Sequence, residues 1–347
     1  MRKAFLHIGM PKTGTTAIQM ALSQSRKTLQ VNGLIYPGCE DDHTILLALY
    51  HQKAVEHYFF GIRGIGAAAA VDQARSLMVG FLHPATAEDA DILLSTEYMH
   101  DADDISLRAL DDDLAEGGIE LNVVCYVRHP FSMAASSIQQ NVKMGHRLLA
   151  DQLKSPDWHS QTKALGTSLK VLGRDRIIVR RFEDARELGA ERDILQAIGY
   201  RGPLDQIARV KVNESLSMAG VALADAHNRL AKAGQFVHAD RSYYFKVGGP
   251  KFSLPPRSIE AIRKKAAVEV AWLQKHFGVL LEEPVLQFPG AGRLSEEVAT
   301  DLVKLILSAE WRNKAPSDAA QAAVEPGNHA HQATETGPAF EAGEAQT

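Results

Sequence analysis

Four short apolar runs, separated by amphipathic segments, form the clearest pattern in the first 200 residues. The runs cover residues 3–8, 90–96, 119–127 and 175–182. Segments with apolar positions at helical spacing lie between and after them, at 15–30, 104–116, 131–142, 157–172 and 183–198. Buried strands that alternate with helices are typical of a parallel sheet covered on both faces. The pattern therefore predicts an α/β, three-layer fold with a central parallel sheet flanked by helices.

Beyond residue 200 the pattern changes to helices alone. Three segments have apolar stripes at helical spacing, namely residues 214–233, 256–277 and 295–312. The last stretch, 313–347, contains no Ile or Leu and is rich in Ala, Glu, Gln, Pro and Gly. We therefore expect one domain over 1–312, with an α/β core at about 1–200 and a helical C-terminal part at about 201–312. We expect the remaining residues to form a disordered tail.

Charge and composition exclude some classes of protein. Lys plus Arg number 38 and Asp plus Glu number 42, so the formal net charge is -4. This balance argues against a general nucleic-acid binder, which presents a basic face. No uncharged run is long enough to cross a membrane, and two cysteines, Cys39 and Cys125, cannot form a disulfide framework. These features predict a cytoplasmic protein without a nucleic-acid partner or a transmembrane segment.

A glycine-rich turn follows the first apolar run, within the stretch HIGMPKTGTTAIQ at 7–19. Gly9 and Gly14 have the spacing of a nucleoside-triphosphate loop, but Thr15 stands where that motif has its lysine. The lysine of this stretch is Lys12, inside the loop. Backbone N–H groups, a helix N-terminus, threonine hydroxyls and an ammonium group would converge at one point. The stretch predicts a P-loop-like oxyanion site; a plain turn with a helix cap is the alternative.

An arginine and a serine follow the strand predicted at 119–127, within YVRHPFSMAASSIQQ at 126–140. Arg128 leaves the carboxyl end of that strand, where open α/β sheets bind their ligands. Ser136 lies eight residues later, early in the next predicted helix. A guanidinium and a hydroxyl in this position favour a second phosphate site. Because strands end in Arg128 and Glu97 rather than in a magnesium-binding aspartate, we expect the anion to be held without a metal.

Together the two stretches resemble the donor-binding motifs of sulfotransferases. PKTGTT at 11–16 looks like their 5′-phosphosulfate loop, whose common form is P-K-S-G-T-T, and YVRHPFSMAASS resembles their 3′-phosphate motif. The resemblance implies 3′-phosphoadenosine 5′-phosphosulfate (PAPS) as the donor. It also implies contacts for the leaving oxygen (Lys12), the 5′-phosphate (Thr13, Gly14, Thr15, Thr16) and the 3′-phosphate (Arg128, Ser136).

Two departures narrow the resemblance. Ala17 stands where cytosolic members often have an aromatic residue, and their C-terminal Arg-Lys-Gly contact with the 3′-phosphate is only faintly echoed by FKVGG at 245–249. The bacterial carbohydrate-type and Golgi-like members are therefore the closer resemblance. It implies a hydroxyl of a carbohydrate or glycolipid as the acceptor, without naming the acceptor or the oligomeric state.

Three residues are candidates for the base that removes the acceptor's proton. Glu97 ends an apolar strand where cytosolic sulfotransferases have a histidine, and partial burial would raise its basicity. His43 precedes an apolar helix, in a loop that could face the acceptor. Glu56 lies in VEHYFFG at 55–61, which resembles the Glu-x-His-Phe-Phe stretch of heparan-type sulfotransferases. The structural alternatives are an ion-pair carboxylate, an exposed helix-start histidine and the end of a core helix.

The sequence therefore predicts a PAPS-dependent sulfotransferase that needs no metal. One alternative is a P-loop nucleotide kinase or NTPase, which Thr15 in the lysine position and the missing strand-end aspartate disfavour. The other is a non-catalytic protein of the same fold that binds 3′-phosphoadenosine 5′-phosphate (PAP) and transfers nothing. Turnover that depends on magnesium would favour the first alternative, and PAP binding without turnover would favour the second.

Overall fold

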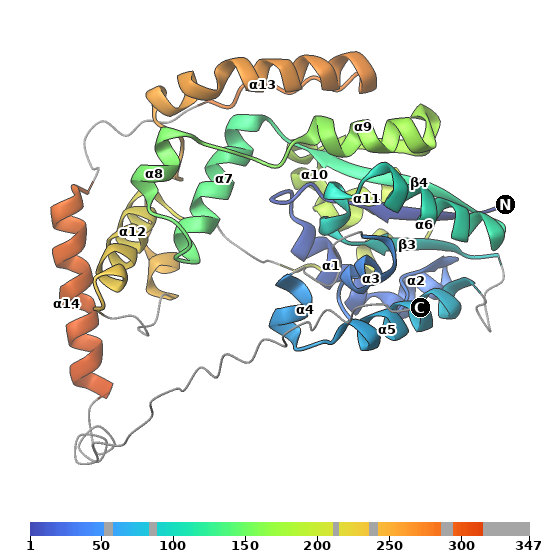
Figure 1. Cartoon of the computed structure of the whole chain (residues 1–347), viewed down its shortest axis with the longest axis horizontal. Coiled ribbons are helices and arrows are strands. Elements are labelled where there is room, and N and C mark those ends of the chain that lie inside the picture. The colour runs from blue at the N-terminus through green and yellow to red at the C-terminus, as the bar shows by residue number, and fades with distance from the viewer. Residues whose placement is uncertain (52–57, 83–88, 211–214, 236–241, 286–293, 315–347) are drawn as a thin grey trace, which may run out of the picture.

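The computed structural model describes residues 1–51, 58–82, 89–210, 215–235, 242–285 and 294–314. A five-stranded parallel sheet in the order β2-β3-β1-β4-β5 forms its centre (Figure 1). The strands are β1 (Arg2–His7), β2 (Leu34–Ile35), β3 (Asp91–Ser95), β4 (Ile119–Val127) and β5 (Ile177–Arg181). The predicted α/β class and all four predicted strands are confirmed. The fifth strand, β2, is too short to give a pattern in the sequence.

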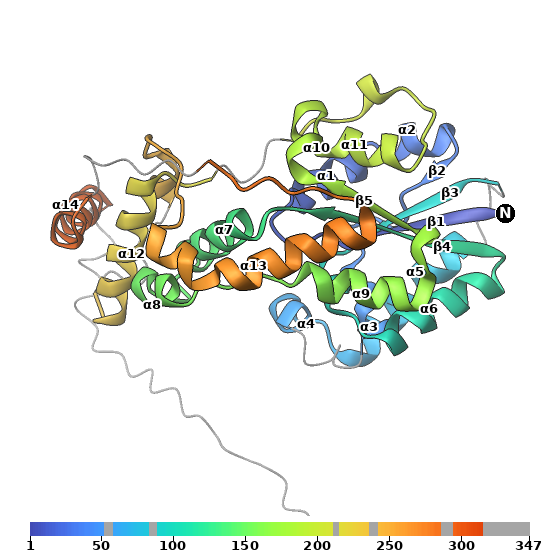
Figure 2. The same cartoon turned by 90° about the horizontal axis from the view of Figure 1, so that it is seen from above.

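Helices cover both faces of the sheet (Figure 2). One face carries α1 (Thr15–Gln24), α2 (Arg26–Val31), α10 (Phe182–Leu188) and α11 (Ala190–Ala197). The other carries α3 (Leu47–Tyr50), α5 (Ala67–Leu82), α6 (Asp104–Glu116) and α9 (Gln161–Leu172), and α4 (Tyr58–Arg63) precedes α5 along the chain. The three predicted layers are therefore present.

Strand β4 shows how the sequence builds these layers. Val124 and Tyr126 belong to the apolar cluster under α1 and α11, whereas Val123 and Cys125 belong to the larger cluster on the opposite face. Successive side chains of a strand point to opposite faces. An apolar run without alternation is therefore buried on both sides, as expected for the interior of a parallel sheet.

A helical part completes the molecule beside the sheet. It contains α7 (Pro130–Lys143), α8 (Leu149–Lys154), α12 (Met218–Lys232), α13 (Pro256–Phe277) and α14 (Glu296–Lys314). Helix α7 packs against α12 and α13, and α14 packs against α12 (Figure 2). The helix predicted at 256–277 has those bounds, because prolines start it and Gly278, in a left-handed conformation, ends it. The predicted tail beyond α14 lies outside the described residues, and the domain boundaries stay predictions.

Two predicted helices are each divided in the structure. The segment 15–30 is interrupted at Ser25, whose backbone leaves the helical region and whose hydroxyl accepts a hydrogen bond from Ala208 N–H at 2.9 Å. The segment 183–198 is interrupted at Gly189, where φ is 100°. Such breaks depend on tertiary contacts and backbone conformation. Among the described residues, no helix combines the length and the apolar character that a membrane crossing requires.

Candidate functional site

The loop between β1 and α1 lies at the carboxyl end of the sheet. Positive φ angles occur at Gly9 (98°), Lys12 (72°) and Gly14 (81°), so the chain turns sharply before the helix starts. Backbone hydrogen bonds hold the loop on β4, from Met10 N–H to Tyr126 C=O at 3.1 Å and from Tyr126 N–H to Gly9 C=O at 2.7 Å. Gly14 supplies no side-chain cap to α1. The first-turn N–H groups of α1 are therefore not capped by this residue, as an anion site requires.

The threonines of the loop differ in what they contact. Thr13 is buried and donates its hydroxyl to Met10 C=O at 2.6 Å, so this side chain stabilises the loop itself. Thr15 is also buried and lies 3.4 Å from the same carbonyl oxygen. Thr16 is exposed in the first turn of α1. Of the predicted 5′-phosphate residues, Thr16 is the most accessible, and Thr13 acts through the shape of the loop.

Lys12 and Glu97 lie close enough for their charges to interact across the loop. Burial lowers the pKa of the Lys12 ammonium, and the Glu97 charge opposes that shift. Burial raises the pKa of the Glu97 carboxyl, opposed by the Lys12 charge and by a hydrogen bond with Thr15. A Cβ added at Gly9 would lie 3.5 Å from Glu97 Cβ, so this carboxyl packs directly against the loop. The structure thus brings a cation and a carboxyl of raised basicity to one place.

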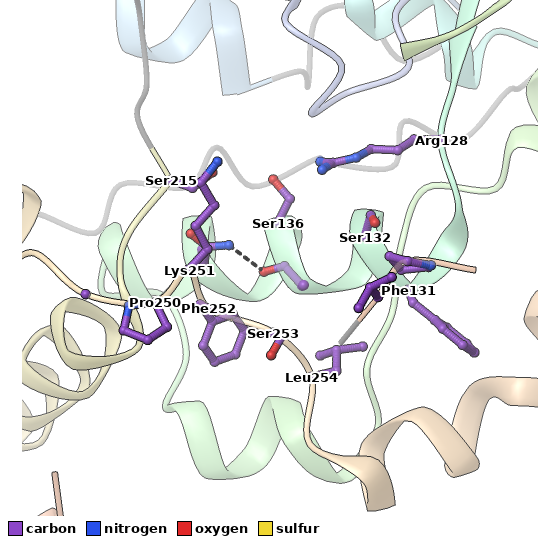
Figure 3. A pocket seen from close by; sticks show the side chains of 15 residues that line it. Arg128, Phe131, Ser132, Ser136, Ser215, Pro250, Lys251, Phe252, Ser253 and Leu254 are labelled. Carbon is purple, nitrogen blue, oxygen red and sulfur yellow. Dashed lines mark hydrogen bonds between the residues drawn. The ribbon is translucent and has the colours of Figure 1, made fainter. Parts of the chain in front are cut away.

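A cavity of about 560 Å³ lies beside the start of α7. Arg128 and Ser136 both line it, and Figure 3 shows the guanidinium and the hydroxyl on the same side of this helix. Ser215 and Lys251, which come from segments far along the chain, line the same cavity. The cavity therefore collects one guanidinium, one ammonium and several hydroxyls, which is a donor set suited to a phosphate.

The Arg128 side chain is largely buried and already has partners. Its Nε donates to a Glu183 carboxylate oxygen at 3.1 Å, and its Cζ lies 5.4 Å from the centre of the Phe182 ring. The same ring faces the loop, because a Cβ added at Gly14 would lie 3.0 Å from Phe182 Cε2. Phe182 therefore stands between the loop after β1 and the arginine after β4.

His43 is buried, and both of its ring nitrogens are engaged. Its Nδ1 accepts a hydrogen bond from Ser95 N–H at 2.9 Å, and its Nε2 lies 3.0 Å from Pro37 C=O, which can only accept. Burial lowers the pKa of His43 to about 4. The ring therefore holds the end of β3 in place and has no nitrogen left for an acceptor's proton. The geometry favours Glu97 over His43 as the base, and Glu56 lies outside the described residues.

A pair of histidines, His100 and His159, lies next to Glu97. His100 Nδ1 donates to the Glu97 carbonyl oxygen, so His100 Nε2 accepts from His159 Nδ1, 3.1 Å away. The Nε2 of neutral His159 then carries no proton. Burial lowers the pKa of His100 to about 4, and it also lowers the pKa of His159, whose charged form Lys12 further disfavours. His159 is therefore a second candidate for the base, and no local pattern in the sequence marks it.

Lys251 and Ser215 are also absent from the sequence-based site. The faint FKVGG echo at 245–249 gave a partial signal, because Gly249 lines the cavity two residues before Lys251. In the part of the chain that the structure describes, no group of three or more His, Cys, Asp or Glu side chains is placed to hold a metal ion.

Comparisons with known proteins find similarity among solved structures alone, where six chains match. No family model and no curated protein matches the chain. The structure is similar to the crystal structure of a sulfotransferase from Alicyclobacillus acidocaldarius, with 14% sequence identity and a TM-score of 0.42. The match covers 70% of this chain and 99% of the other. Similarity at this level does not assign a function to the chain.

Proposed function

We propose that this protein is a sulfotransferase that moves the sulfuryl group of PAPS to an acceptor hydroxyl without a metal. One observation carries the proposal: two cationic sites lie at the carboxyl ends of paired strands, with Lys12 after β1 and Arg128 after β4. Phe182 contacts both sites. A nucleoside with phosphates at its 5′ and 3′ positions has the two anionic ends that such an arrangement would hold.

In the proposed reaction, the acceptor oxygen attacks the sulfur of the phosphosulfate. A new O–S bond forms, and the bond between sulfur and the 5′-phosphate oxygen breaks, leaving its electron pair on the phosphate. Lys12 stabilises the negative charge that develops on this oxygen, which is why a lysine inside the loop suits the reaction. The acceptor's proton passes to a base, so the products are a sulfate ester and PAP.

Glu97 is the base that the geometry supports best. Burial raises the pKa of its carboxyl, and a more basic carboxylate accepts a proton more readily. Its partners also fix its place: the Thr15 hydroxyl on the loop side, and His100, which donates to its main-chain carbonyl. After transfer, the protonated Glu97 would lie beside Lys12 and lower the negative charge there.

For the acceptor we propose a hydroxyl of a carbohydrate or glycolipid, as the motif resemblance implies. Phe245 is 39% exposed, and Lys143 Nζ lies 4.3 Å from the centre of its ring. The Lys143 charge also acts on the pKa of Lys12, which supports the proposal that this aromatic and cationic surface serves the acceptor. Aromatic rings with a few polar groups are typical of small-molecule sites. A cytoplasmic location remains part of the proposal.

Isothermal titration calorimetry of the whole chain tests the donor assignment. We expect PAP to bind without metal and at least tenfold more tightly than 5′-AMP, which lacks the 3′-phosphate, because a hydrogen bond to a charged group contributes about 1.5–3 kcal/mol. Equal affinity for the two nucleotides would contradict the second phosphate site. Preference for ATP with magnesium would support a kinase or NTPase. PAP binding without sulfuryl transfer to any screened hydroxyl would support the non-catalytic alternative.

A further inference from the structure

The backbone of Arg128 is held by a side chain rather than by a neighbouring strand. The Gln161 amide oxygen accepts from Arg128 N–H at 2.8 Å, and its amide nitrogen donates to Arg128 C=O at 3.0 Å. Gln161 is the first residue of α9 and is fully buried. One amide thus pairs with both polar groups of one peptide residue, as an adjacent strand would.

Gln161 binds the chain just after β4, where the pairing between β4 and β1 ends. Tyr126, two residues earlier on β4, exchanges both of its backbone hydrogen bonds with Gly9 and Met10. Backbone groups two residues apart on a strand point to the same edge. Beyond Met10 the chain turns into the loop before α1, so none of the strands in the described residues pairs with Arg128 on that edge. The Gln161 amide gives both of these partly buried backbone groups a hydrogen-bond partner.

A buried carboxylate fixes the orientation of this amide. Glu269 of α13 is 4% exposed, and its Oε1 accepts from Gln161 Nε2 at 2.6 Å and from Trp158 Nε1 at 2.9 Å. Its Oε2 lies 3.4 Å from the Ser160 hydroxyl. Because Glu269 only accepts, the NH₂ group of Gln161 faces α13 and its oxygen faces Arg128 N–H. The reversed amide would set donor against donor.

As a means of stabilising the fold, a buried carboxylate in this arrangement is unfavourable. Within the described residues Glu269 forms no ion pair, and hydrogen bonds from Trp158, Ser160 and Gln161 contact its carboxylate. Removing a carboxylate from water without a cation is unfavourable, and a well-packed apolar side chain is often as stabilising or more so. What the carboxylate adds is a fixed backbone at the residue whose guanidinium lines the cavity.

We propose that Glu269 and Gln161 are positioning residues for recognition of the 3′-phosphate, so that α13 takes part in nucleotide selection through Arg128. The inference rests on the proposed function, because it needs a ligand with a 3′-phosphate. A fixed backbone at Arg128 restricts the positions that its guanidinium can take. Binding sites lose affinity when the residues that support such a contact group do not hold it in place.

The test measures the affinity of PAP and of 5′-AMP for the whole chain and for variants. Glu269→Met removes the carboxylate at similar length, and we expect it to weaken PAP at least tenfold while 5′-AMP changes less than threefold. Glu269→Gln keeps an acceptor oxygen in the same place, so we expect it to retain the wild-type preference for PAP. Rescue by this conservative variant would assign the effect to the hydrogen bonds.

Asn228→Leu is the matched control. Asn228 is another buried amide that binds a backbone carbonyl, that of Val142 at 2.7 Å, away from Arg128. We expect this variant to lower the melting temperature by an amount comparable to Glu269→Met and to keep the wild-type ratio of the two affinities. A control that lost the ratio as well would contradict a specific role of α13, because general loosening would then explain both variants.

Further outcomes decide the remaining cases. If Glu269→Met folds and keeps the preference for PAP, the inference is overturned. If it does not fold, Gln161→Met supplies the same measurement, and failure of both to fold would overturn the inference by assigning the network to stability. If the wild-type chain itself does not distinguish PAP from 5′-AMP, the proposed function fails instead.

Discussion

The two sites at the carboxyl edge of the sheet are built in opposite ways. The site after β1 comes from one short stretch whose backbone takes unusual angles at Gly9, Lys12 and Gly14. The site after β4 is assembled from segments far apart in the chain, with Arg128 and Lys251 lining one cavity. The first candidate site therefore depends on the shape of the main chain, whereas the second depends on side chains that separate elements bring to one place.

We expect the largest effect from a substitution of Glu97, the proposed base. Glu97→Gln keeps size and hydrogen bonding but removes basicity, so the rate of sulfuryl transfer should fall by on the order of 10²–10⁴ while PAP affinity is kept. Burial raises the pKa of Glu97, so the wild-type rate should rise with pH through that raised value as the carboxyl loses its proton. Steady-state rates against pH, with an acceptor found by screening, measure both.

The acid limb of that profile should be absent from the Glu97→Gln variant. If the variant keeps both the limb and a rate near that of the wild type, Glu97 is not the base. The same profile for His159→Gln would then show whether His159 accepts the proton, and the assignment of the donor site would be unaffected.

Lys12→Met separates catalysis from binding within the loop. Methionine has a similar length and the same restriction at positive φ, so the loop should keep its shape while the charge is lost. Because the charge on the leaving oxygen appears only as the bond breaks, kcat should fall by about 10²–10³ and PAP affinity by much less. Wild-type kcat in this variant, from initial rates at saturating PAPS, would refute the proposed mechanism.

Arg128→Met should affect the assembled site alone. We expect PAP affinity to fall at least tenfold and 5′-AMP affinity to stay nearly constant, since a charged hydrogen bond of about 1.5–3 kcal/mol is lost only for the 3′-phosphate. Titration calorimetry with both nucleotides measures the ratio. An equal loss of affinity for both nucleotides would mean that the two sites do not bind independently, which would contradict the separation of the two sites.

Gly14→Ala should have the smallest of these effects and should not distinguish the nucleotides. The added Cβ meets the Phe182 ring at 3.0 Å, and alanine at a φ of 81° is strained. Such strain costs on the order of 1–3 kcal/mol. We expect a lower melting temperature and a similar loss of affinity for PAP and 5′-AMP, measured by calorimetry. A loss confined to PAP would place the 3′-phosphate at the loop and reverse the assignment of the sites.

The difference between a contiguous site and an assembled site also explains which features could be predicted from the sequence. The loop, Arg128 and Ser136 were identified because each motif is contiguous, and the bounds of α6 and α13 followed from their apolar stripes and end signals. The assignment of these residues to groups of a nucleotide stays a prediction.

Other features were beyond the reach of local patterns. Lys251 lines the same cavity as Arg128, Gln161 binds the Arg128 backbone and Glu269 binds Gln161 only when distant segments pack together. The environment of His43 is likewise set by Ser95, far away in the sequence. Helix α5 was not predicted, because its alanine-rich sequence gives little contrast between its faces.

The position of Phe182 has a consequence for which positional isomer of the nucleotide can bind. One rigid ring lies beside both Gly14, the residue before α1, and the guanidinium of Arg128 after β4. A rigid ring between the two proposed anion sites would fix the distance between them. In a nucleotide, the distance from the 5′-phosphate to a second phosphate depends on whether the second phosphate is on the 2′ or the 3′ carbon of the ribose. We therefore expect the protein to discriminate between positional isomers of its nucleotide, binding adenosine 3′,5′-bisphosphate in preference to the 2′,5′ isomer of equal charge. A smaller side chain at position 182 should reduce that discrimination.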